Sequence, residues 1–83
     1  MDPVELYHKL GVKPFQPMRV HLTDGRSYDI LDRRLVIVGE TYLTIGIPAP
    51  RATEPIFDHL VWVDLKDIRS VEPLPMSMAL ASR

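Results

Sequence analysis

The residues of this chain that are best suited to bind a charged ligand are arginines that lie close together in the sequence. They are Arg19, Arg26, Arg33 and Arg34. Guanidinium groups bind phosphate oxygens through parallel hydrogen bonds, so this group could contact the backbone of RNA or single-stranded DNA. Asp24, Asp29 and Asp32 are interspersed among these arginines, and exposed ion pairs contribute little to stability. We favour a solvated rim of local ion pairs and keep nucleic-acid contacts as the alternative.

The histidines and potential nucleophiles of the chain form no recognisable catalytic or metal-binding motif. His8, His21 and His59 have none of the spacings that metal sites use, and the chain contains no cysteine. The sequence has no glycine-rich phosphate loop and no serine–histidine–aspartate arrangement. We therefore expect no enzymatic activity, no metal site and no cofactor.

Length and composition indicate one globular domain. The chain has 83 residues, of which 46% are hydrophobic and 25% charged, and its formal net charge is −1. A domain that binds nucleic acid usually carries a basic excess, which is missing here. The longest uninterrupted apolar run, residues 35–38, is too short to span a bilayer, and no signal peptide is visible, so we expect a cytoplasmic protein.

The elements that position these residues are short. A helix is expected over residues 2–10, with Asp2 as its N-cap, Tyr7 and Leu10 as its anchors and Gly11 at its end. Residues 18–31 predict two strands joined by a tight turn at Asp24 and Gly25. Further strands are expected at residues 35–38, 42–47, 60–63 and 68–72, with a proline-rich loop at residues 48–58.

This order predicts a mainly β protein, a small five- to six-stranded barrel with a short N-terminal α-helix. Asp64 is expected to cap a single 3₁₀ turn before the last strand, and Phe15 to close one end of the core. The domain covers residues 1–73, and residues 74–83 form a C-terminal tail that we expect to be flexible.

Two motifs in this order resemble the Sm-like branch of the SH3-like barrels. One is the hairpin Val20-x-Leu22-x-Asp24-Gly25-Arg26, and the other is the ending Ile68-Arg69-Ser70-Val71-Glu72-Pro73 after a short turn. The longer phrase Pro14-Phe15-x-Pro17-x-Arg19-Val20 and its continuation resembles the opening of a group of short bacterial proteins with no established activity. The resemblance implies a small barrel that assembles through its strand edges.

The same resemblance does not extend to RNA binding. The RNA-chaperone branch of the Sm-like proteins carries a tyrosine, a lysine and a histidine in the turn before the last strand. The corresponding residues here are Asp64, Leu65 and Lys66. The aromatic and histidine side chains that read RNA in those relatives are therefore not present.

The middle strands carry apolar residues on both faces, so one face needs a cover beyond the core. The candidate interface residues are Val36, Val38, Tyr42, Val61 and Val63. Tyr28, Tyr42 and Trp62 could stack on unpaired bases, but in a small barrel such side chains more often belong to the core or to an interface.

We predict a non-enzymatic binding or assembly module that forms a homo-oligomer. The alternatives are an RNA or single-stranded nucleic-acid binder and an accessory subunit that docks through residues 48–58.

Overall fold

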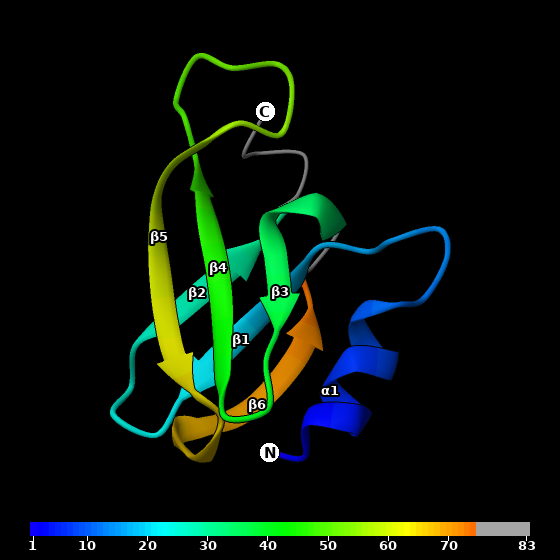
Figure 1. The fold of residues 1–83 in the computed structure, drawn as a ribbon, viewed down its shortest axis with the longest axis vertical. Coiled ribbons are helices and arrows are strands. Elements are labelled where there is room, and N and C mark those ends of the chain that lie inside the picture. The colour runs from blue at the N-terminus through cyan, green and yellow to red at the C-terminus, as the bar shows by residue number, and fades with distance from the viewer. Residues whose placement is uncertain (75–83) are drawn as a thin grey trace.

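The computed structural model describes residues 1–74, which form one helix and two three-stranded antiparallel sheets (Figure 1). The first sheet has the strand order β2-β1-β6 and the second has the order β3-β4-β5. The elements are α1 (Pro3–Leu10), β1 (Met18–Leu22), β2 (Ser27–Ile30), β3 (Val36–Val38), β4 (Tyr42–Pro48), β5 (Phe57–Asp64) and β6 (Ile68–Pro73). The predicted mainly β class with a short N-terminal helix is confirmed.

The N-terminal helix begins and ends where the sequence predicts. The Asp2 carboxylate accepts a hydrogen bond from the Val4 N–H at 3.3 Å, and the Gly11 N–H donates to the His8 carbonyl at 3.2 Å. Leu10 is fully buried, as predicted, but Tyr7 is exposed and the second anchor is Leu6. Leu6 and Leu10 lie four residues apart, so they share the face of the helix that packs on the sheets.

The β1-β2 hairpin forms as predicted, and Met18 lies opposite Ile30 and Val20 opposite Tyr28. Gly25 has a φ of 93°, a conformation that side chains with a Cβ rarely adopt. The Asp24 carboxylate accepts a hydrogen bond from the Arg26 N–H at 3.0 Å, which closes the turn. Local chemistry alone therefore accounts for the Asp24-Gly25 pair.

The strands β3 and β5 begin at other residues than predicted. Arg33–Leu35 forms a 3₁₀ turn, η1, which Asp32 caps at the Arg34 N–H, so β3 begins only at Val36. Strand β5 begins three residues before the predicted Leu60, because Phe57 pairs with Pro48 across an irregularity in the β4-β5 ladder. The proline-rich loop is correspondingly shorter than residues 48–58.

The C-terminal boundary also differs. Strand β6 includes Pro73, and the Leu74 N–H donates to the Pro17 carbonyl at 2.9 Å. The chain is thus still tied to the start of β1 at Leu74, where the tail was predicted to begin. Residues 75–83 of the predicted tail lie outside the described residues.

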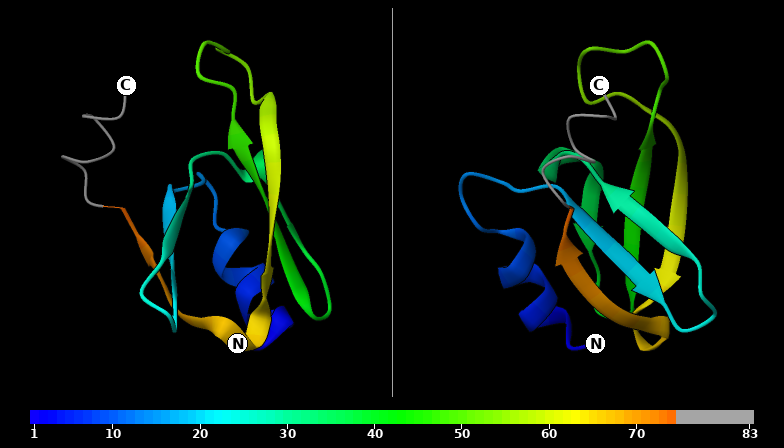
Figure 2. Two further views of the ribbon diagram at one scale, coloured as in Figure 1. Left: turned by 90° about the vertical axis from the view of Figure 1, so that its left-hand side faces the viewer. Right: turned by 180° about the vertical axis from the view of Figure 1, so that it is seen from behind.

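The core lies between the two sheets, and α1 lies beside β3 and β6 at one side of them (Figures 1 and 2). The second 3₁₀ turn, η2 (Leu65–Asp67), connects β5 to β6, and Asp64 caps it as predicted. Within residues 1–74, the backbone ladders join strands of the same sheet only, so the arrangement is open. The fully buried side chains from both sheets and the helix are Leu6, Leu10, Val20, Ile30, Leu43 and Ile45.

Candidate functional site

The outer face of the β2-β1-β6 sheet is polar. Arg19 lies opposite Asp29 on β2 and Glu72 on β6, and its guanidinium donates to both Asp29 carboxylate oxygens at 2.8 and 3.2 Å. The His21 Nε2 lies 2.7 Å from a carboxylate oxygen of Glu72. The charged side chains of this face thus pair with one another across the three strands.

The outer face of the β3-β4-β5 sheet is apolar. Ile37 is 68% exposed, Tyr42 52%, Phe57 54%, Leu60 39% and Trp62 66%. Large hydrophobic side chains exposed next to one another on one sheet commonly mark an interaction surface. These five residues are called the apolar face below.

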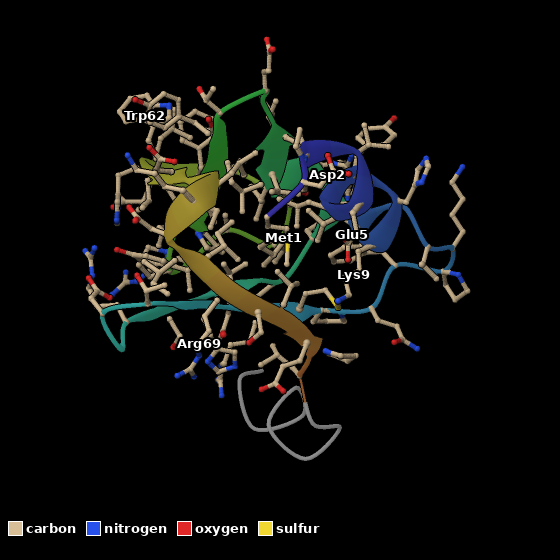
Figure 3. All side chains as sticks on the ribbon, turned by 90° about the horizontal axis from the view of Figure 1, so that it is seen from below. Met1, Asp2, Glu5, Lys9, Trp62 and Arg69 are labelled. Carbon is tan, nitrogen blue, oxygen red and sulfur yellow. The ribbon has the colours of Figure 1, made fainter. Side chains whose placement is uncertain are left out.

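The register of the sheet explains why these side chains point outward. Thr44 on β4 lies opposite Ile37 on β3 and Trp62 on β5, while its neighbours Leu43 and Ile45 are buried. Because side chains alternate along a strand, the row through Thr44 must face away from the core. Figure 3 shows Trp62 projecting from this side of the molecule and Arg69, on β6, from the other.

A recess of about 70 Å³ lies in the apolar face over Gly46. A Cβ atom at Gly46 would lie 3.1 Å from the Phe57 Cβ and 3.4 Å from a Leu35 methyl group. Glycine therefore lets Phe57 lie directly on the sheet beside Leu60. The recess gives the apolar face a shape into which a side chain of a partner could fit.

The structure places the predicted interface residues on both sides of the sheet. Val36 and Val63 are buried in the core, and Val38 and Val61 are half-buried and packed against it. Tyr42 is exposed on the apolar face. The valines do not form the outer surface, because their strand positions face the other sheet.

The predicted arginine group does not present a set of unpaired charges. Arg26 donates to Asp24 at 2.7 Å and Arg34 to Asp32 at 3.0 Å, in addition to the Arg19–Asp29 pair. The Arg26 backbone N–H and then its guanidinium lower the pKa of Asp24 below its usual range. These pairs agree with the interpretation as a rim of local ion pairs.

The fourth arginine, Arg33, has a different environment. Its Nη1 donates to the Val36 carbonyl at 2.9 Å, and its guanidinium carbon lies 5.6 Å from the centre of the Tyr7 ring. Among residues 1–74, no carboxylate forms an ion pair with it. Arg33 also lines a cavity of about 610 Å³ between α1 and residues 11–15.

The described part of the chain contains no group of three or more histidines, aspartates or glutamates arranged to hold a metal ion. His59 instead lies 3.0 Å from its neighbour Asp58. In the turn before the last strand, Leu65 is buried and Asp64 caps the turn. No helix within residues 1–74 has the length and apolarity needed to cross a membrane.

Comparison with known proteins gives no relative. No protein-family model, no curated protein sequence and no solved structure matches this chain. The apolar face and the cavity beside α1 are therefore the two features from which function can be argued.

Proposed function

We propose that this protein is a non-enzymatic assembly module that self-associates through the apolar face of its β3-β4-β5 sheet. The observation that carries this proposal is the contrast between the two outer faces. The outer face of β2-β1-β6 bears the Arg19–Asp29 and His21–Glu72 pairs, whereas the opposite outer face exposes Trp62 and Ile37. A sheet needs one apolar face for its own core, so a second apolar face serves a partner.

We further propose that the two sheets form a small barrel of the SH3-like, Sm-like type. Three features support this assignment: the first strand pairs with the last, the 3₁₀ turn η2 leads into the last strand, and η1 lies where the chain passes from β2 to β3. In a barrel of this type the two outer faces are on opposite sides, so one can be hydrated while the other binds.

A second copy of the same chain is the partner that the apolar face fits best. Its five side chains are uncharged, and Arg34, which lines the recess, is paired with Asp32, so two copies can meet without burying an unpaired charge. Two-fold pairing would place the same patch against itself, and the Gly46 recess could receive a side chain from the other copy. Aromatic residues such as Trp62 and Tyr42 are enriched at the centres of such interfaces.

The test is the molar mass in solution, measured by light scattering over a range of concentrations. One chain has a mass of 9.5 kDa, and the proposal expects a multiple of that value that falls on dilution. Ile37→Glu, on the apolar face, should shift the protein to one chain. Ser27→Glu adds the same charge to an exposed strand position of the other sheet and should leave the mass unchanged.

A mass of 9.5 kDa at every concentration would overturn the proposal. A ring that binds oligonucleotide with an affinity falling steeply with salt would instead favour the nucleic-acid alternative. The ion pairs of Arg19, Arg26 and Arg34 do not support that alternative.

A further inference from the structure

A cleft of about 610 Å³ lies between α1, the segment 11–15 and the 3₁₀ turn η1. Cavities of roughly 300–1,000 Å³ are typical of small-molecule sites in proteins. Leu10 is fully buried at the cleft, and Phe15 is half-buried and packed against the core. The side chains of Tyr7 and Val12 are exposed beside them, so much of the cleft lining is apolar.

The charges at this cleft have one sign. Arg33 and Lys13 line it, and no aspartate or glutamate does. Elsewhere in residues 1–74 the arginines of β1 and of the β1-β2 turn are bound to carboxylates, as is Arg34 directly beside Arg33. The cleft thus combines an apolar lining with cations that no carboxylate of the lining neutralises.

Arg33 is also held in position. The Val36 carbonyl accepts a hydrogen bond from one of its terminal nitrogens at 2.9 Å, and the Tyr7 ring lies under its guanidinium. Arginine has five N–H donors, so this bond leaves others for a ligand. A half-buried cation that is already fixed loses less side-chain entropy on binding an anion than a free surface arginine does.

We propose that this cleft binds a small organic anion whose carboxylate or phosphate pairs with Arg33 and Lys13 and whose apolar body lies on Val12 and Phe15. The cleft shares none of its lining residues with the apolar face. This proposal therefore goes beyond self-association and does not depend on it.

The test is an amide NMR titration of the full chain with three probes: decanoate, decanol as its uncharged match, and adenosine monophosphate as the phosphate probe. The proposal expects saturable shifts in the amides of residues 10–15 and of Arg33 with decanoate or adenosine monophosphate. Decanol should bind more weakly, because it lacks the charge that Arg33 recognises.

Arg33→Gln should weaken binding of the anion about tenfold or more, since a hydrogen bond to a charged group is lost, and should leave decanol unaffected. Arg34→Gln is the matched control, because Arg34 is already paired with Asp32 and should bind as the unaltered chain does. Lys13→Gln supplies a second variant at an exposed position in case Arg33→Gln perturbs the fold.

The pattern of responses decides the outcome. Binding of decanoate alone identifies a carboxylate ligand, binding of adenosine monophosphate alone a phosphate ligand, and binding of both a site for either anion. Shifts with neither anion, or equal affinity in the Arg33→Gln, Lys13→Gln and unaltered chains, would overturn the proposal. These chemical-shift changes report ligand binding, whereas self-association is tested by molar mass. Either proposal can therefore be overturned without the other.

Discussion

Replacing Trp62 by alanine should remove the largest single contribution to self-association. Trp62 is 66% exposed in the isolated chain, and an aromatic side chain of its size presents about 200 Å². Covering the exposed part would remove about 130 Å² from water in each copy. At about 25 cal/mol per Å², that is about 3 kcal/mol per copy and about 6 kcal/mol for the two copies of a dimer. Only part of the buried area appears as affinity, so Trp62→Ala should weaken the dimer at least about 100-fold.

The fold itself should tolerate this substitution. The inward-facing neighbour of Trp62, Val63, supplies the core contact of β5, whereas Trp62 faces away from it. The free energy of unfolding should therefore change by only about 0.5 kcal/mol, as at other surface positions. Sedimentation equilibrium measures the dissociation constant, and urea unfolding under monomeric conditions measures the stability.

The control is Val12→Ala, which shortens another exposed apolar side chain that lies outside the apolar face. It should leave the dissociation constant within about threefold of that of the unaltered chain, which is a change of less than about 1.4 kcal/mol in the free energy of binding. The reasoning would be refuted if Trp62→Ala dissociated no more readily than Val12→Ala. It would also be refuted if both substitutions weakened the dimer equally, because the patch would then have no defined location.

Three further predictions concern the fold. Leu43→Ala should lower the free energy of unfolding by about 2–5 kcal/mol in urea, because Leu43 is fully buried between the sheets; a loss below about 1 kcal/mol would contradict the described core. Gly46→Ala should cost about 1–3 kcal/mol in the same assay, since its Cβ would lie 3.1 Å from that of Phe57, and an unchanged midpoint would show that Phe57 does not lie over the glycine. The Arg34 side chain and backbone N–H lower the pKa of Asp32 in the folded protein. The Asp32 carboxylate therefore stabilises the fold at pH values above its unfolded pKa of about 3.9, and this stabilisation is lost as the pH falls through the lower pKa of the folded state. Between about pH 5 and pH 2, the free energy of unfolding measured in urea should therefore fall less in Asp32→Asn than in the unaltered chain. The same dependence of this free energy on pH in both proteins would contradict the Asp32–Arg34 pair.

The elements that the sequence predicts well are those determined by neighbouring residues. Asp2 and Gly11 bound the helix, Gly25 determines the hairpin turn, and Asp64 caps the 3₁₀ turn before the last strand. Each of these positions acts on a backbone group within a few residues of itself. A single sequence therefore contains nearly all the information needed to place them.

The outer surface of the β3-β4-β5 sheet depends on long-range register instead. Residues 35–38 are all apolar, so alternation along them cannot show whether Val36 or Ile37 faces the core. Pairing with β4 decides it, because Val36 lies opposite the buried Ile45 and Ile37 opposite Thr44. Carrying the alternation of residues 42–47 across to the neighbouring strands could have identified Ile37 and Trp62 as outward-facing.

The cleft beside α1 could not be predicted in this way. It forms where three segments meet, and the distinct role of Arg33 arises from its contacts with Tyr7 and the Val36 carbonyl. In the sequence, Arg33 and Arg34 are equivalent neighbours. Only the fold shows that one is paired with Asp32 and that the other faces a cleft without carboxylates.

The most direct test of self-association through the apolar face uses the single tryptophan of the chain as its own reporter. Trp62 emission and its quenching by acrylamide are recorded over a dilution series, with light scattering on the same samples. The proposal predicts that Trp62 changes from protected and blue-shifted to exposed and red-shifted at the concentration where the mass falls to 9.5 kDa. A mass transition during which Trp62 remains fully exposed to acrylamide would contradict it.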